Sequence, residues 1–513
     1  MLYNSNNWNL IAKIIYELQI MTDIDGQLLA FKALEEEPRR EMLEMIVSRL
    51  KKSGFPNDTG DTVYDKLVEK ITNRKKTHYL MEALCYIDQK LVHQNEVRHF
   101  MLNSEASVSP MRQLNINAEE LGILILPRLY CSWSRKGRDK FTELSVSRGI
   151  NELMQSYYYV DVKALGGFKV HHYMMNNPEK DSVKFLRIAV SPLTNGNVLA
   201  IKKYSAEGCK KIAIVGVGSD CVEDESEDKK VEKEFYVSRR GLEDKVLKVI
   251  DKAAEIKADI LMFPEMLGTK EIREQSLERL ACLEIETNGM HPPSVTLLPT
   301  EWEYGNCGEG AEPWKAGNNT NTLYVACSGS LIEGEGFKET FRQQKQNPYL
   351  EKAAVLSGAV EDIKADKSIN VLHIPNLGRI VFPICADLLA ASYRKILIEV
   401  LGATLVLCPS FSKGFDDFIQ LTNIGNPFGC RIVWCDSCAV RHLYEKNTHG
   451  VFKECDICCI GAYGGRNYTP IKPQPQCKDG KCGNLCLFYI DIPLSAFSFG
   501  DVSGKLRWQH LTA

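Results

Sequence analysis

The chain has 513 residues, which is long for a single hydrophobic core and predicts two or more domains. Its 63 Lys and Arg residues nearly balance its 66 Asp and Glu residues, giving a formal net charge of −3. This balance excludes a global attraction to nucleic acid or to an anionic membrane as the main interaction.

The N-terminal sequence and the cysteine content indicate a cellular compartment. Residues 1–20 contain no charged start, continuous apolar run or small-residue cleavage site, so we expect no secretory signal. No apolar run has the length of a membrane span. The 18 cysteines are then expected to be reduced, buried or ligating, which predicts a cytoplasmic protein without a membrane partner.

Residues 1–112 are predicted to be a helical N-terminal region. The segment 38–54 begins with Pro38, suited to a first helical position, has apolar residues at helical spacing and ends at Gly54. The segment 77–92 places Leu80, Leu84 and Ile87 on one face. This pattern is typical of a helix bundle, and it contains no catalytic constellation.

Residues 113–207 are predicted to be a mixed α+β region with several short apolar runs typical of strands. His171 and His172 are adjacent on one of these runs, where successive side chains point to opposite faces, which argues against a shared metal site. The segment Arg128–Lys140 mixes basic and aromatic residues. It is either a solvated basic loop or a contact for a phosphate backbone.

Residues 208–513 alternate strand-like and helix-like segments, which predicts an α/β domain. The stretch Gly378–Ser410 is the clearest example, because an apolar β-branched run, a tight turn, a helical pattern and a second apolar run follow one another. Cys385 falls at the turn, before the predicted helix. Because a helix N-terminus favours an anion, its thiolate is expected to be unusually accessible.

Two further residues of this domain follow predicted strands: Glu265 in LMFPEM and Lys345 in FRQQKQNPYLEK. Strand ends are where α/β folds usually hold catalytic groups. The order of these segments resembles the nitrilase or carbon–nitrogen hydrolase superfamily. The matching features are the FPE strand end, the Lys after an NT-led strand, the Cys followed by Ala386 and Asp387, and the strands that follow.

The resemblance covers roughly residues 208–500 and implies a four-layer αββα sandwich. It implies Glu265 as the general base, Lys345 as the group that stabilises the tetrahedral intermediate, and Cys385 as the nucleophile of a thioester mechanism without a cofactor. Many members use a second glutamate, for which Glu351 is the candidate. Members commonly pair through the sandwich, so the resemblance also implies a homo-oligomer.

Two segments depart from the family pattern. Ala386 stands where many members have an aromatic residue, and the continuation to Ser392 lacks the usual Arg, so the substrate contacts are not transferable. The segment Glu301–Asn319 is a Gly-rich insertion before the predicted Lys strand. It is interpreted as a surface loop, or alternatively as a lid over the site.

The C-terminal part is rich in cysteine. Cys435 and Cys438 form one C-x-x-C pair, and Cys455 and Cys458 form a second, at a spacing that fits a structural zinc site. The alternative is that the cysteines in RIVWCDSCAV are small apolar residues of a sheet strand, with no metal.

Two functions remain open at this point. The first is a thiol-dependent hydrolase of a non-peptide carbon–nitrogen bond, with a small amide or carbamoyl substrate favoured over a nitrile. The alternative is a nitrilase-like module of a multidomain regulatory or antiviral-defence assembly, which binds a ligand, or a protein or nucleic-acid partner through the N-terminal region. The segment YYYVDVK lacks the second Asp of a polymerase motif, so polymerase activity is not predicted.

Overall fold

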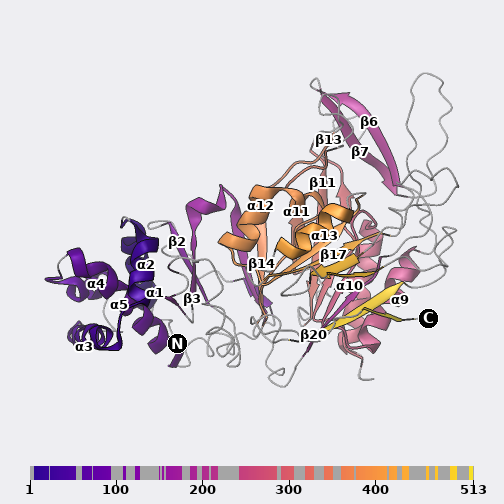
Figure 1. The fold of residues 1–513 in the computed structure, drawn as a ribbon. Coiled ribbons are helices and arrows are strands. Elements are labelled where there is room, and N and C mark those ends of the chain that lie inside the picture. Colours follow the sequence, from indigo (N-terminus) through magenta and orange to yellow (C-terminus); the bar gives the residue numbers. More distant parts are fainter. Residues whose placement is uncertain are drawn as a thin grey trace, which may run out of the picture. The chain divides into compact units, whose positions relative to one another are not determined.

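The computed structural model of the chain is shown in Figure 1. The structure describes residues 5–21, 23–53, 60–71, 73–93, 108–110, 122–127, 150, 153–154, 157–175, 185–192, 199–206, 209–217, 242–285, 290–305, 318–328, 340–350, 360–374, 377–412, 415–424, 430–437, 458–461, 468–471, 486–493 and 508–511.

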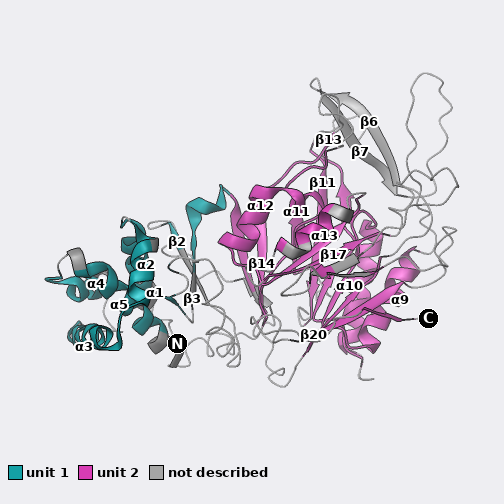
Figure 2. Ribbon diagram, viewed as in Figure 1, with its two compact units in different colours: residues 1–105, 111–167 teal, residues 106–110, 168–513 magenta. Residues whose placement is uncertain are grey.

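The chain divides into two compact units (Figure 2). The first comprises residues 1–105 and 111–167, and the second comprises residues 106–110 and 168–513. The division near residue 167 differs from the domain limits at 112 and 207 expected from the sequence. The difference arises because residues 168–207 belong to the second unit.

The first unit contains the helices of the N-terminal region. They are α1 (Ser5–Gln19), α2 (Ile24–Lys32), α3 (Glu36–Lys52), α4 (Gly60–Val68) and α5 (Asn73–His93). Helix α3 has acidic residues in its first turn and basic residues in its last turn, which complements the helix dipole. It buries Ile46 and Leu50, and α5 buries Leu80, Leu84 and Ile87 in the same apolar core. Burial of these faces stabilises the bundle.

A short hairpin completes the first unit. Strand β2 (Ile123–Pro127) pairs antiparallel with β3 (Tyr157–Asp161), and a 3-10 turn, η3 (Val162–Leu165), follows. Ile123 joins the apolar core of the helices. This hairpin therefore belongs with the helical region, although the sequence placed it in a separate mixed region.

The second unit contains a first eight-stranded sheet, in the order β1-β4-β14-β15-β16-β17-β18-β19. Its strands are β1 (Val108–Pro110), β4 (Lys169–Met175), β14 (Ser368–Ile374), β15 (Gly378–Val381), β16 (Leu405–Ser410), β17 (Arg431–Asp436), β18 (Cys458–Gly461) and β19 (Tyr468–Ile471). Strands β15, β16 and β17 run parallel, and every residue of β16 and β17 is buried. Such continuous burial is typical of strands covered on both faces.

The second sheet of this unit has the order β10-β11-β9-β8-β5-β20-β21, with β12 paired to β11. Its strands are β5 (Phe185–Val190), β8 (Ile260–Met262), β9 (Val295–Leu297), β10 (Glu301–Glu303), β11 (Thr320–Cys327), β12 (Phe341–Gln344), β20 (Leu487–Pro493) and β21 (Gln509–Leu511). Strand β5 pairs with β8 and with β20. The sheets therefore include β4 and β5, which precede residue 208.

Helices pack against strands of both sheets. Helices α9 (Leu242–Glu255) and α10 (Lys270–Ile285) share an apolar core with residues of β5, β8, β11 and β20. Helix α13 (Phe415–Ile424) lies on β17, where Phe418 stacks on Trp434 with ring centroids 5.0 Å apart. The fold is thus mixed α/β, which confirms the fold class predicted from the sequence at this level.

Side chains of β12 join the two sheets. The Phe341 ring lies 4.6 Å from that of Tyr173 on β4 and 5.3 Å from that of Phe382, which follows β15. Gln343 Nε2 donates to Ser368 O on β14 at 3.0 Å, and Gln343 Oε1 accepts from Asn370 N at 2.9 Å. These contacts fix the end of β12, and with it Lys345, against the first sheet.

A third sheet has three strands, two that precede β12 in the sequence and one that follows it. Strand β6 (Leu199–Ala206) pairs antiparallel with β7 (Cys209–Val217), and the two-residue strand β13 (Val360–Glu361) runs parallel to β7. The bridge from Leu350 to Val360 brings β13 back to the segment after Lys345. This pairing determines where Glu361 lies.

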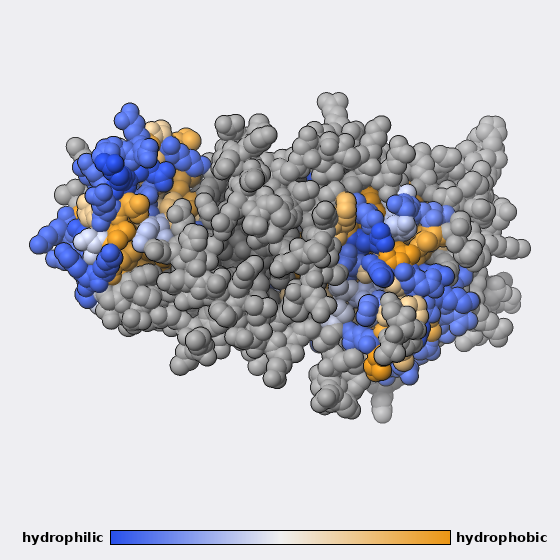
Figure 3. Space-filling model, turned by 90° about the horizontal axis from the view of Figure 1, so that it is seen from below, coloured by the Kyte–Doolittle hydropathy of each residue, from blue (hydrophilic) through white to orange (hydrophobic). Residues whose placement is uncertain are grey.

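The surface of the described residues mixes hydrophilic and apolar side chains. On the face drawn in Figure 3, hydrophilic residues and smaller apolar areas alternate over the described atoms of each unit. Among the described helices, none is both long and apolar enough to cross a membrane.

Candidate active site

Cys385 occupies a strained turn between β15 and a short helix, α11 (Ala386–Leu389). Its backbone has φ 47° and ψ −106°, a conformation that residues with a Cβ rarely adopt. Cys385 N donates to Pro409 O on β16 at 2.9 Å, which holds the turn against the neighbouring strand. A strained strand-to-helix turn is the device by which many hydrolases present a nucleophile.

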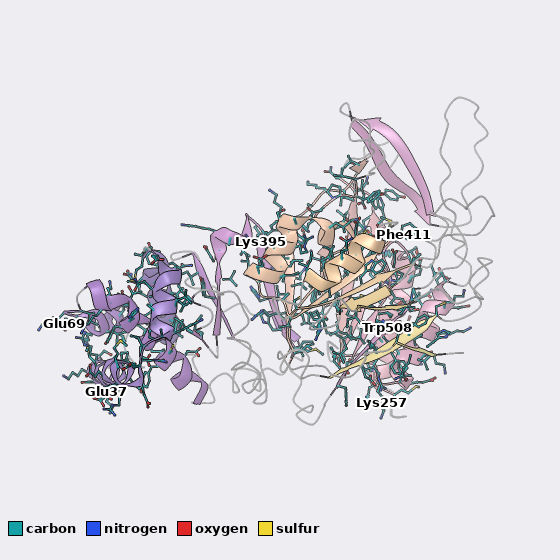
Figure 4. All side chains as sticks on the ribbon, viewed as in Figure 1. Glu37, Glu69, Lys257, Lys395, Phe411 and Trp508 are labelled. Atoms are coloured by element: carbon teal, nitrogen blue, oxygen red, sulfur yellow. The ribbon has the colours of Figure 1, made fainter. Side chains whose placement is uncertain are left out.

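The thiol of Cys385 is buried beside the end of β16. Ser410 Oγ lies 3.3 Å from Cys385 Sγ and donates to it. Phe411, labelled in Figure 4, follows β16, and its carbonyl oxygen lies 4.0 Å from the same sulfur atom. The sulfur thus has polar neighbours on the side of β16.

Glu265 follows β8 of the second sheet and is fully buried. Its backbone N–H donates to Ser410 O at 3.3 Å, so the strand ends of the two sheets meet at this point. Oε1 accepts hydrogen bonds from Asn321 Nδ2 and from Lys345 Nζ, each at 2.8 Å. Oε2 is buried without an N–H or O–H donor among the described residues, which leaves it to the thiol.

Lys345 directly follows β12, and its side chain is also fully buried. Its ammonium group lies 2.8 Å from Glu265 Oε1 and 2.7 Å from Glu361 Oε2. The backbone N–H donates to Asn321 O at 2.9 Å. Two carboxylates therefore surround one ammonium group next to the thiol.

Asp387 ties the turn of Cys385 to the segment that carries Lys345. Its Oδ2 accepts from Ile384 N at 3.0 Å, and its Oδ1 accepts from Gln346 N at 2.9 Å and from Asn347 N at 2.6 Å. Burial raises the pKa of Asp387 to about 6, although these N–H donors act in the opposite direction. The carboxylate fixes the two loops relative to each other.

The buried environment shifts the pKa values of the three groups. Burial raises the pKa of the Cys385 thiol well above its usual range, the Glu265 carboxylate adds to this effect, and Lys345 opposes it. Burial also raises the pKa of Glu265, while Lys345 and the thiol lower it. Burial alone would lower the pKa of Lys345, but the carboxylates of Glu265 and Glu361 raise it well above its usual range.

These shifts favour the thiol form of Cys385 and the charged ammonium form of Lys345. The Glu265 carboxyl group is within hydrogen-bond reach of the thiol. The expectation that a helix N-terminus would favour a thiolate is wrong here, because α11 has only four residues and burial dominates. The predicted helix also breaks at Ala390, before α12 (Ala391–Lys395) and a π-helical turn, η5 (Ile396–Val400).

The structure brings together Glu265, Lys345 and Cys385, the three residues singled out from the sequence. Glu351, the candidate second glutamate, lies outside the described residues. The glutamate that contacts Lys345 is Glu361, which sequence reasoning missed. Asn321 and Ser410 were also missed, although both belong to strand segments, NTLYVAC and ATLVLCPS, that carried part of the resemblance.

Other sequence-based candidates lie away from this cluster or outside the description. His171 is exposed, whereas His172 is buried with Nδ1 2.9 Å from His373 Nε2. The segment Arg128–Lys140 lies outside the described residues, as does most of the insertion Glu301–Asn319 beyond β10.

The zinc hypothesis stays a prediction. Cys435 is buried on β17, and Cys458 is its register partner on β18. Cys438 and Cys455 lie outside the described residues. Across the part of the chain that the structure describes, no group of three or more His, Cys, Asp or Glu side chains has an arrangement that could hold a metal ion.

Comparisons with known proteins add a structural likeness. No family model matches the chain, and no curated protein matches it. Among solved structures, the chain is similar to an amidase from Nesterenkonia sp., with 13% sequence identity, a TM-score of 0.33, and coverage of 61% of this chain and 92% of that chain. At this identity and score, membership of the hydrolase superfamily stays a prediction.

Proposed function

We propose that this protein is a thiol-dependent hydrolase of a non-peptide carbon–nitrogen bond, acting on a small amide or carbamoyl compound rather than on a nitrile. The observation that supports the proposal is the single buried cluster in which Lys345 joins Glu265 and Glu361 beside a cysteine held at positive φ. As part of the same proposal, the two sheets and their helices form the four-layer αββα sandwich of the nitrilase-like fold.

In the first half of the reaction, Cys385 Sγ attacks the carbonyl carbon of the amide while Glu265 takes the thiol proton. The carbonyl oxygen becomes an oxyanion, and the Lys345 ammonium group stabilises its charge. The raised pKa of the thiol fits this order, because the proton leaves only as the sulfur–carbon bond forms.

Collapse of the tetrahedral intermediate breaks the carbon–nitrogen bond. Glu265 returns its proton to the leaving nitrogen, which departs as ammonia or an amine, and the acyl group remains on Cys385 as a thioester. Burial raises the pKa of Glu265, so its protonated form is accessible for this step.

In the second half, water replaces the leaving amine. Glu265 removes a proton from this water, the resulting hydroxide attacks the thioester carbon, and Lys345 again stabilises the oxyanion. The sulfur–carbon bond breaks, the thiol regains its proton from Glu265, and a carboxylic acid or a carbamic acid is released.

The test is hydrolysis of a panel of small primary and secondary amides, with ammonia or amine release as the readout. Mass spectrometry of the protein after rapid acid quench measures an acyl adduct on the peptide that contains Cys385. We expect release from at least one amide together with that adduct. Folded protein that shows neither would overturn the proposal.

A further inference from the structure

The buried surroundings of the thiol contain more carboxyl groups than cationic groups. Four buried carboxyl groups act on this site: Glu265, Glu361, Asp387 and Asp436. Lys345 is the one cationic side chain of the described chain that forms an ion pair with any of them. Uncompensated charge inside a protein is costly, so such an excess favours a ligand that carries positive charge.

Asp436 is the one of these four carboxyl groups that neither contacts Lys345 nor joins the Cys385 turn to the Lys345 segment. It ends β17, and its register partner on the parallel strand β16 is Ser410. Partners in register direct their side chains to the same face of a sheet, and Ser410 Oγ lies 3.3 Å from Cys385 Sγ. Asp436 therefore lies on the same face as the thiol, one strand away.

The partners of Asp436 are backbone groups. Its oxygens accept from Ser412 N at 3.2 Å and 3.3 Å, and Oδ1 accepts from Ser437 N at 2.9 Å. No Lys, Arg or His side chain of the described residues pairs with it, although its side chain is 1% exposed. This differs from Glu265 and Glu361, each of which contacts an ammonium group.

Three hydrogen bonds from two backbone N–H groups, the shortest at 2.9 Å, do not offset the loss of solvation of this carboxyl group. Burial raises the pKa of Asp436 well above its usual range, and the nearby Glu265 carboxylate adds to the effect. A cation placed against Asp436 would stabilise its ionised form and offset both contributions. A positively charged ligand group would therefore complement the Asp436 carboxylate.

We propose that Asp436 binds a cationic nitrogen group of the substrate, an ammonium or a guanidinium group carried on the acyl side of the scissile amide. The inference rests on the proposed hydrolase function and names its substrate class: small amides or carbamoyl compounds with a positive charge. A charged hydrogen bond formed in the buried site would orient the carbonyl carbon toward Cys385.

A pair of affinity labels tests the cation site without requiring turnover. The probes are N-(2-guanidinoethyl)iodoacetamide, which is positively charged, and N-(2-ureidoethyl)iodoacetamide, its neutral isostere. Alkylation forms a bond between Cys385 Sγ and the methylene carbon, expels iodide and releases the thiol proton. The second-order rate constant is followed by mass spectrometry of the peptide that contains Cys385, in the full chain.

Two variants sharpen the comparison. Asp436→Asn removes the charge and retains one acceptor oxygen for the N–H groups of Ser412 and Ser437. Asp251→Asn removes the same charge from α9, where Asp251 pairs with Arg279 at 2.6 Å, away from the thiol. It controls for the change in net charge.

In the wild-type protein we expect the guanidinium probe to label Cys385 about 10- to 100-fold faster than the urea probe. The ratio should fall to about 1 in Asp436→Asn and stay unchanged in Asp251→Asn. A wild-type ratio near 1, or a high ratio retained by Asp436→Asn, would overturn the inference. If Asp436→Asn does not fold, the wild-type ratio alone decides.

A second arm separates this inference from the proposed function. Short ω-aminoalkanamides are compared with ω-hydroxyalkanamides of equal length as hydrolysis substrates. Equal hydrolysis of both series would overturn the cation site and leave the hydrolase function standing. Absence of hydrolysis and of any acyl adduct would overturn the hydrolase function, while a high labelling ratio that requires Asp436 would still support the cation site.

Discussion

The second unit buries two sets of ionisable side chains, a histidine pair and the cluster around Cys385, whose pKa values shift in opposite directions. His172 on β4 and His373 on β14 form a pair with ring nitrogens 2.9 Å apart, and burial lowers the pKa of both. Around Cys385, burial raises the pKa values of the thiol and of Glu265, and the pKa of Lys345 is also raised by its two carboxylate partners. Burial thus favours the neutral form of the histidine pair, whereas in the cysteine cluster the two carboxylate partners favour the charged form of Lys345.

The comparison shows that burial of titratable groups does not by itself define a reactive site. The histidines lie within regular strands and lack a charged hydrogen-bond partner in the described residues. Cys385 lies at a strand end, at positive φ, with an acid, a base and a hydroxyl group within reach. The opposed charges and the strained turn distinguish the candidate site.

The largest effect is expected from removal of the sulfur. Cys385→Ala should reduce kcat on the order of 10⁶-fold, the size found when a protease loses its nucleophile. The loss is measured by ammonia release, with circular dichroism to verify folding. Cys282→Ala, at an exposed cysteine of α10, is the control and should retain full activity. Comparable activity in the two variants would contradict the role of Cys385.

The next effect concerns the ammonium group. Lys345→Ala should reduce kcat about 10²- to 10³-fold, because the oxyanion loses its stabilising charge. It also leaves Glu265 and Glu361 buried without a cation, which should lower the free energy of unfolding by about 3–5 kcal/mol.

A matched substitution on the surface calibrates the stability change. Lys252→Ala breaks the exposed ion pair with Glu255 on α9 and should change the free energy of unfolding by less than about 0.5 kcal/mol. Urea denaturation measures both variants. Equal losses of stability would mean that the pairing of Lys345 with the two glutamates contributes no more than a surface ion pair.

A smaller effect distinguishes the two candidates for the second glutamate. Glu361→Gln retains the size of the side chain but weakens its contact with Lys345 at 2.7 Å, so kcat should fall about 10- to 100-fold. Glu351→Gln should leave kcat near the wild-type value. Steady-state kinetics on one amide measures both, and the reverse order of the two losses would restore Glu351 as the assisting residue.

The sequence predicts the three central residues because local signals mark them. Glu265, Lys345 and Cys385 each follow an apolar strand-like run, and the turn at Cys385 separates a strand pattern from a helical one. Glu361 has no such signal, since β13 has two residues and exists through its pairing with β7, about 150 residues earlier in the chain. The sequence therefore favours Glu351, the glutamate nearer to Lys345 along the chain.

The limits of the two compact units differ from the predicted domain limits for a related reason. Strand β5 was recognised as an apolar run, but periodicity does not say which strands it pairs with. Its partners are β8 and β20, and the ion pair of Arg187 with Asp491 spans 304 residues of sequence. Strand pairing over such sequence separations depends on packing in the folded chain. The change in composition near residue 207 therefore does not mark the boundary between the two compact units.

The smallest effect on activity, and a distinct effect on acid stability, is expected from the histidine pair. Burial lowers the pKa of His172 to about 3, below its usual value of 6.5, and lowers that of His373 in the same direction. The unfolded chain binds protons more readily than the native protein in the window from about pH 6.5 to pH 3. Native stability is therefore present at neutral pH and is lost as the pH falls through this window.

The double variant His172→Leu/His373→Leu removes both groups from this proton balance. The wild-type protein should lose up to about 1.4 kcal/mol of unfolding free energy per pH unit for each histidine, and the variant should lose correspondingly less. Denaturation curves at several pH values between 4 and 7 measure the slopes. Hydrolysis at neutral pH should remain that of the folded fraction, because the neutral pair carries no charge that could act on Cys385. A large loss of kcat in folded variant would contradict the separation of the two clusters, and parallel slopes would show that these histidines do titrate in the native protein.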